Sequence, residues 1–217
     1  MRALQRFYGV PIIRQELANL VLSVERDELG IAAGLQDRVA QSYNEPVFMD
    51  FNRAHMERHG YGVYERLDIP DDLNLFVAFR TDLAEGSEIL HSRLRDDYNN
   101  GVPAVLAAIE EWAHLTDVVR AAMKRGDYGE VERCLRRNFA LRCEVCSSTV
   151  SPKNRLMVEL ADSLGAAAKL TGSGGAIIGI YHDEAHFGQL KRLFAQNQIE
   201  IVKPHIVTSG APDAECC

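Results

Sequence analysis

The glycine-rich segment Thr171–Gly175, with the sequence TGSGG, constrains the fold of this chain more than any other stretch. It lies between two short apolar runs, Ala167–Leu170 and Ala176–Tyr181. Glycine adopts backbone conformations that other residues avoid, and two short runs around such a turn are typical of a β-hairpin. The segment therefore predicts two antiparallel strands late in the chain.

The pattern around this hairpin predicts an α+β fold. Leu73–Arg80 alternates like a strand, and the hairpin is followed by a helical pattern at Glu184–Gln196 and a strand at Ile199–Val207. Pro204 interrupts that last strand and favours a position at the sheet edge. Three more helices are expected at Pro103–Lys124, Tyr128–Val145 and Asn154–Leu164. This order predicts helices over an antiparallel sheet of the split-βαβ type.

The first third of the chain carries a separate group of elements. Gln15–Asp27 reads as an amphipathic helix, and Pro46–Phe51 and Tyr61–Leu67 read as short strands that pair antiparallel. Ala3–Tyr8 resembles the closing turn of a helix. Residues 210–217 are expected to form a loose tail.

Composition excludes several classes of function. The 217 residues carry a net charge of −7, which argues against broad binding of nucleic acid or anionic membranes. No apolar run approaches the roughly 20 residues of a membrane span, and the start has no signal-peptide core.

Five cysteines without such a signal predict reduced thiols and a cytoplasmic location. Cys143 and Cys146 form a lone CxxC, which lacks the second pair that a zinc site needs.

One acidic residue stands in a setting that suits catalysis. In Gly30–Gln41, GIAAGLQDRVAQ, small residues lead to Asp37 in the first turn of a predicted helix. Leu35 and Val39 lie four residues apart and share the inner face, so Asp37 points elsewhere. The glycines and alanines leave room for another molecule near the backbone. An ordinary helix start has the same appearance, since the helix dipole favours acids there.

The TGSGG segment is also a candidate anion site. Successive amides of a glycine-rich loop can converge on an anion, and Lys169 adds a nearby positive charge. A plain hairpin turn is the alternative. The chain has no GxxxxGK[ST] motif, and Ile177 stands where a dinucleotide fingerprint needs its third glycine. A P-loop or Rossmann site is therefore not expected.

A third candidate is His91–Arg95, with the sequence HSRLR, which follows the strand Leu73–Arg80. Loops at strand ends are common ligand positions, and Arg93 is suited to paired hydrogen bonds with a carboxylate or phosphate. A solvated helix start is the alternative. Three residues of a later helix are expected either to face the same space or to form a helix surface: Asn138, Phe139 and Arg142.

Taken together, these segments resemble the GHMP superfamily of small-molecule kinases, and within it the glucuronokinases. The resemblance rests on GIAAGLQDRVAQ, VFMDF at Val47–Phe51, HSRLR, NFALR at Asn138–Arg142, and GAAAKLTGSGGA at Gly165–Ala176. Their order matches that of the family from about Ala3 to Ser209. The resemblance implies residues 1–70 as part of the N-terminal domain of such a kinase, and 71–209 as a complete ferredoxin-like C-terminal domain.

The resemblance also implies roles for individual residues. Asp37 matches the catalytic aspartate, which accepts or orients the proton of the attacking sugar hydroxyl. Glu25 matches a carboxylate that holds Mg²⁺, with Asp27 or Glu28 as alternatives. The glycine segment would seat the phosphates of ATP through Thr171, Gly172, Ser173, Gly174 and Gly175. The cations implied for a sugar carboxylate are Arg38, His91 and Arg93.

The implied activity is ATP-dependent phosphoryl transfer to the anomeric hydroxyl of glucuronate, a small sugar acid. The GLSGSS-type loop that wraps the ATP phosphates in this family does not occur in the sequence, and the chain matches the C-terminal part of such a kinase. We therefore expect the isolated chain to be inactive, or to need a missing segment supplied in trans. The alternatives are a non-catalytic binding module that self-associates, and a specificity like that of galactokinases or heptose kinases.

Overall fold

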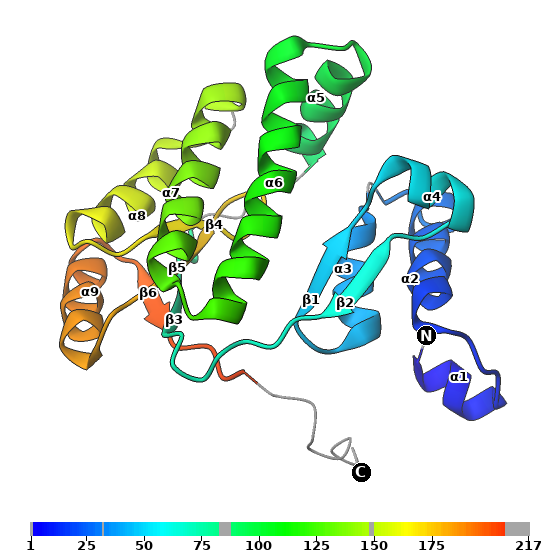
Figure 1. The fold of residues 1–217 in the computed structure, drawn as a ribbon, viewed down its shortest axis with the longest axis horizontal. Coiled ribbons are helices and arrows are strands. Elements are labelled where there is room, and N and C mark those ends of the chain that lie inside the picture. Colours follow the sequence, from blue (N-terminus) through cyan, green and yellow to red (C-terminus); the bar gives the residue numbers. More distant parts are fainter. Residues whose placement is uncertain (1, 32, 83–87, 148–149, 207–217) are drawn as a thin grey trace. The chain divides into compact units, whose positions relative to one another are not determined.

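The computed structural model describes residues 2–31, 33–82, 88–147 and 150–206. The chain divides into two compact units, one containing the described residues up to Ile69 together with Ile206, and the other spanning Pro70–His205. Each is described by itself. We call them unit 1 and unit 2 (Figure 1). The expected tail at 210–217 and the end of the predicted strand at Val207 lie outside the described residues.

Unit 1 contains helices and one small sheet. The elements are α1 (Arg2–Tyr8), α2 (Arg14–Ser23), a π-helical turn η1 (Val24–Glu28), α3 (Leu35–Tyr43), β1 (Val47–Asp50), α4 (Arg53–His59) and β2 (Val63–Arg66). The expected antiparallel pairing is confirmed, with Val47 opposite Arg66 and Asp50 opposite Val63. The helix predicted at Gln15–Asp27 is confirmed as α2, but it widens into the π turn at its end.

Unit 2 contains the predicted hairpin. Its elements are β3 (Leu75–Phe79), α5 (Glu88–Asn99), α6 (Pro103–Arg125), α7 (Tyr128–Val145), α8 (Pro152–Ser163), β4 (Ala168–Leu170), β5 (Ala176–Ile180), α9 (Glu184–Gln196) and β6 (Glu200–Val202). The strands lie in the order β4-β5-β3-β6, and every pair is antiparallel. This is the strand order of a split-βαβ sheet, so the α+β prediction is confirmed.

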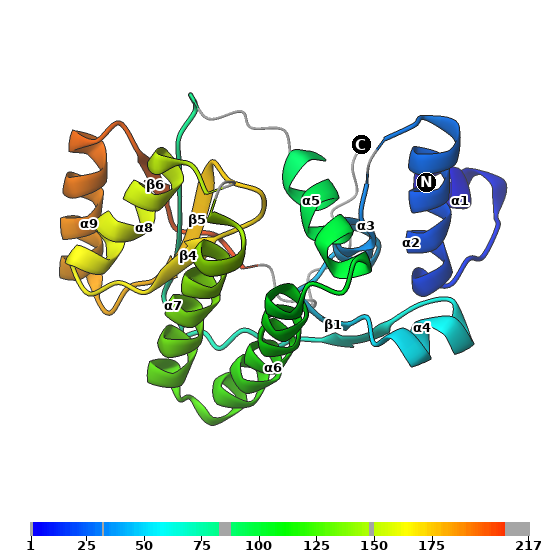
Figure 2. The ribbon, with the colours of Figure 1, turned by 90° about the horizontal axis from the view of Figure 1, so that it is seen from above.

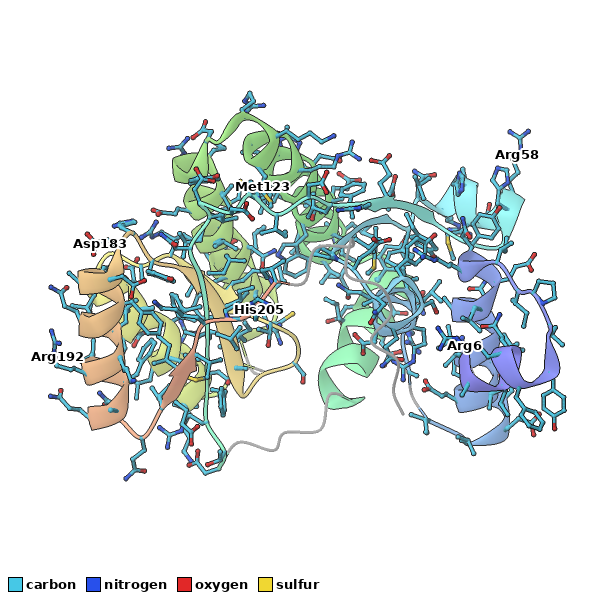
Figure 3. The ribbon with its side chains drawn as sticks, turned by 90° about the horizontal axis from the view of Figure 1, so that it is seen from below. Arg6, Arg58, Met123, Asp183, Arg192 and His205 are labelled. Carbon is cyan, nitrogen blue, oxygen red and sulfur yellow. The ribbon has the colours of Figure 1, made fainter. Side chains whose placement is uncertain are left out.

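The core of unit 2 lies between the sheet and the helices α8 and α9. These two helices lie against one face of the sheet (Figures 1 and 2). Side chains from both layers are fully buried there, among them Phe76, Met157, Ile177, Leu190 and Phe194. The opposite face of α9 is polar, and Arg192 points away from the sheet (Figure 3). β6 is an edge strand, as Pro204 suggests, and it is shorter than predicted.

Among the described residues, none of the helices combines the length and apolar character that crossing a bilayer requires.

Candidate functional site

Asp37 is the third residue of α3, directly in its first turn. Gly34 precedes the helix with an extended backbone. Val39 is fully buried, whereas the Asp37 side chain is 77% exposed. The prediction that Asp37 points away from the apolar face of its helix is therefore confirmed, and its carboxylate is accessible.

Arg38 brings Glu25 and Asp37 together. Its Nη2 forms an ion pair with Glu25 Oε2, and its Nη1 lies 3.3 Å from Asp37 Oδ2. Nη1 also donates to the carbonyl oxygen of Gly34 at 3.3 Å. The Arg38 and Glu25 side chains are only 14% and 22% exposed. Two carboxylates from different helical turns thus share one partly buried guanidinium.

Glu25 lies in the π turn that closes α2. The amide of Leu29 donates to the Val24 carbonyl at 3.1 Å, which gives the wide hydrogen bond of a π turn. The Glu25 carbonyl accepts from the amide of Ile31 at 2.8 Å. Turns of this kind are rare and occur often at functional sites. Glu25 is therefore fixed by its backbone as well as by Arg38.

The donor set of Glu25 and Asp37 fits Mg²⁺. This cation takes one or two protein carboxylates and completes its shell with water and phosphate oxygens. Within the described part of the chain, no group of three or more His, Cys, Asp or Glu residues is placed to hold a metal ion. The two carboxylates beside Arg38 are thus compatible with a cation whose remaining ligands are phosphate oxygens and water. They are too few for a site in which the protein supplies every ligand.

In unit 2, the glycine loop Thr171–Gly175 connects β4 to β5 (gold in Figure 2). The Thr171 amide donates to the Ala176 carbonyl at 3.1 Å, and the Gly175 carbonyl accepts from the Arg80 amide at 3.0 Å. Gly175 has φ +79°, a left-handed conformation that favours glycine. The ends of the loop are thereby tied to the sheet.

Two side chains from helices hold this loop. Arg142, near the end of α7, donates from Nη1 to the Gly172 carbonyl at 2.6 Å and from Nη2 to the Ser173 carbonyl at 2.8 Å. Asn154, in the first turn of α8, is fully buried and accepts from the Gly175 amide at 2.8 Å. The loop is therefore a supported structure and not a bare turn.

The surroundings of the loop are electropositive. Burial lowers the pKa of Lys169, and the neighbouring Arg142 lowers it further. Burial likewise lowers the pKa of Arg142. Lys169 Nζ donates to the Leu170 carbonyl at 3.0 Å, and neither cation pairs with a carboxylate of the described residues. The positive end of the α8 dipole also lies at the loop, beside Asn154.

Of the two interpretations of His91–Arg95, the helix is confirmed and the loop is wrong. His91 and Arg93 lie inside helix α5, because the polar segment Glu88–Asn99 continues as a helix where the strand Leu73–Arg80 suggested a loop at its end. Their side chains lie outside what the structure describes. Of the later candidates, Phe139 packs against the core of unit 2, and the Asn138 carbonyl accepts from Trp112 Nε1 at 3.3 Å. Only Arg142 of that group reaches the loop.

No disulfide joins the cysteines of the described chain, which are Cys134, Cys143 and Cys146. The CxxC pair lies at the end of α7, with Cys146 buried and Cys143 half-buried. The thiols Cys216 and Cys217 lie outside the described residues.

Comparisons with known proteins find similarity to kinases. Residues 119–200 match the family model described as GHMP kinases C terminal. Probable glucuronokinase 2 of Arabidopsis thaliana is 39% identical over 176 residues, and Glucuronokinase 1 of the same plant is 35% identical over 181 residues. These matches cover 79% and 82% of this chain.

A solved structure shows the same fold. The Streptococcus pneumoniae phosphomevalonate kinase superposes with a TM-score of 0.73 at 17% identity, over 95% of this chain and 66% of that one. The chain spans about half of the curated relatives that it matches, 48% and 49% of their lengths.

Proposed function

We propose that this chain, which has the fold of the GHMP kinases and carries their C-terminal domain, acts in phosphoryl transfer from ATP to the anomeric hydroxyl of glucuronate. A role as a sugar kinase follows from its relatives, and glucuronate is the finer proposal. The observation that carries it is the 35–39% identity to two proteins named as glucuronokinases. We assign residues 1–70 to an N-terminal kinase domain and 71–209 to the C-terminal domain.

Asp37 is the proposed catalytic residue. Its exposed carboxylate accepts or orients the proton of the sugar hydroxyl, while the hydroxyl oxygen forms a bond to the γ-phosphorus and the bond to the leaving ADP oxygen breaks. Arg38 positions that carboxylate beside Glu25. Glu25 is the proposed Mg²⁺ ligand, and the bound cation would neutralise charge on the phosphates. The glycine loop Thr171–Gly175 seats the phosphates through its amides.

The sugar carboxylate is proposed to meet His91 and Arg93 of α5, with Arg38 as a third cation. Arg38 already contacts Glu25, Asp37 and the Gly34 carbonyl, so His91 and Arg93 are the first to test.

We expect the 217-residue polypeptide alone to release no ADP from ATP with glucuronate in a coupled assay. Its sequence contains no GLSGSS-type loop, and preorganised charge around the phosphates is the main catalytic factor in phosphoryl transfer. Adding a glucuronokinase fragment that carries this loop should restore turnover, with glucuronate preferred over galactose, which lacks the C6 carboxylate. Robust turnover by the polypeptide alone would contradict the proposal, and a preference for galactose would favour the galactokinase-like alternative.

A second candidate function, a non-catalytic binding module, is favoured by unit 1. In the described part of this unit, the only buried apolar residues are Leu17, Ala18 and Val39. Large apolar side chains are exposed instead, among them Leu4, Phe7, Tyr8, Ile13 and Leu29. Exposed apolar groups in such number mark interaction surfaces.

We therefore expect the isolated chain to self-associate. Light scattering with size-exclusion chromatography should give a mass above the 24.2 kDa of one chain and rising with concentration. Changing Phe7, which is 79% exposed, to serine should reduce the association. Arg58→Ser on α4 serves as an exposed, charged control. A stable monomer across the concentration range would exclude this candidate.

A further inference from the structure

Arg142 makes an unusual set of contacts for a surface arginine. Both of its terminal nitrogens donate to backbone carbonyls of the glycine loop, those of Gly172 and Ser173. Its Nε is buried and has no hydrogen-bond partner among the described residues. Arg136, on the same helix as Arg142, donates to the Gly165 carbonyl but also pairs with Asp162 of α8. Arg142 has no carboxylate partner among the described residues. The contacts of Arg142 thus support the loop, and no carboxylate of the described residues neutralises the guanidinium.

These contacts fix the direction of the loop amides. In a trans peptide, the carbonyl and the following N–H point in opposite directions, and the chain has no cis peptide bond among its described residues. With the Gly172 and Ser173 carbonyls turned toward Arg142, the amides of Ser173 and Gly174 turn away from it. Within the described chain, neither amide has an acceptor. The Gly175 amide, by contrast, is occupied by Asn154.

We infer that Arg142 is the positioning residue of the glycine loop, and that it presents the amides of Ser173 and Gly174 to a phosphate-class anion on the opposite side. The inference rests on the proposed phosphate-binding role of the loop and names the groups that perform it. Arg142 acts through the backbone and does not touch the anion.

The charges near the loop support an anion as the ligand. The guanidinium of Arg142 and the ammonium of Lys169 are partly desolvated and lack carboxylate partners in the described chain. Burial of unpaired cations is costly unless a negative group offsets them. The start of α8 adds the positive end of its dipole through Asn154. A phosphate bound to the loop amides would reduce the electrostatic cost of these positive charges without contacting Arg142.

The test is a titration of ¹⁵N-labelled full chain with inorganic pyrophosphate. We expect the amide resonances of Ser173 and Gly174 to shift together and to saturate, while the Gly175 amide moves little because Asn154 holds it. In Arg142→Gln, the affinity should fall about tenfold, since a charged double contact is lost. The ¹H–¹⁵N NOE of residues 172–174 should fall as well, because the loop loses its support.

Matched variants separate positioning from charge. Arg133→Gln removes the same charge from an exposed site on the same helix and should change the affinity less than about twofold. Arg142→Lys retains the charge but loses the fork, so it should recover part of the affinity and not the loop order. Arg142→Lys also replaces Arg142→Gln as the test variant if Arg142→Gln fails to fold.

The outcomes are distinguishable. Saturable shifts at Ser173 and Gly174 without any kinase activity would keep the inference and reject the proposed function. Unchanged loop NOE values in a folded Arg142→Gln variant would overturn the positioning role. Absence of shifts at these two amides in the unmodified chain would overturn the anion site.

Discussion

Replacing Gly174 with alanine should lower the free energy of unfolding of unit 2 by about 2–3 kcal/mol. A Cβ at this position would overlap Asn154 Nδ2 and lie 3.2 Å from Cγ and 3.3 Å from Oδ1. Asn154 is fully buried and cannot swing into solvent. Any shift of its side chain stretches the hydrogen bond from the Gly175 amide, so overpacking and a lost buried hydrogen bond act together.

Gly172→Ala is the matched control for this prediction. No atom lies within 4 Å of a Cβ there, and its backbone is not left-handed, so the change should stay within about 0.5 kcal/mol. Urea unfolding can be followed by the fluorescence of Trp112, which is the only tryptophan of the chain and belongs to unit 2. Equal stability of the two variants would show that Asn154 does not support the loop.

The same loop shows which features could be predicted from the sequence alone. The hairpin was predictable because glycines between two short apolar runs act locally. The support of the loop was not, since Arg142 and Asn154 lie 30 and 21 residues from the atoms that they contact. The sequence marked Arg142 as a candidate within NFALR, but it did not show that Arg142 contacts the glycine loop. Contacts of this kind come from tertiary packing, which single-sequence periodicity does not encode.

Helix prediction succeeded where an apolar stripe was present. The helices at Tyr128–Val145 and Glu184–Gln196 have the predicted bounds, and each begins at an aspartate that caps it. The helix α4 was missed because its segment is rich in polar residues and shows no clear apolar period. For the same reason, the sequence left α5 undecided between a loop and a helix start. The outcome at α5 matters for function, because it places His91 and Arg93 within a helix.

The π turn at Glu25 illustrates a further limit. The sequence predicts one helix across Gln15–Asp27, and the wide turn gives no signal in the pattern of apolar residues. Its effect is to fix Glu25 where Arg38, thirteen positions later, forms an ion pair with it. The proximity of Glu25 and Asp37 followed from family resemblance, not from spacing.

Lys169→Met should make the anion-free chain more stable by roughly 1–2 kcal/mol at neutral pH. The reason is that an apolar side chain of similar length would replace a partly buried cation that has no carboxylate partner among the described residues, which removes a desolvation cost. The same change should weaken pyrophosphate binding about tenfold, because it removes a charge beside the loop. Lys191→Met on α9, an exposed lysine, should change neither quantity appreciably. Urea unfolding with and without pyrophosphate measures both effects.

The pH dependence of the free energy of unfolding identifies the cause of that gain in stability. The pKa of Lys169 in the folded chain lies below its ordinary value of 10.5, so the unfolded chain binds more protons between the two values and stability rises with pH there. The advantage of Lys169→Met should therefore be full below the folded pKa and vanish as the pH approaches 10.5. An advantage that persists at that pH would assign the gain to packing.

A saturating anion should make the unmodified chain more stable than Lys169→Met, because only the lysine form gains its full binding free energy. That reversal would mean that Lys169 lowers the stability of the anion-free chain and raises that of the anion-bound chain.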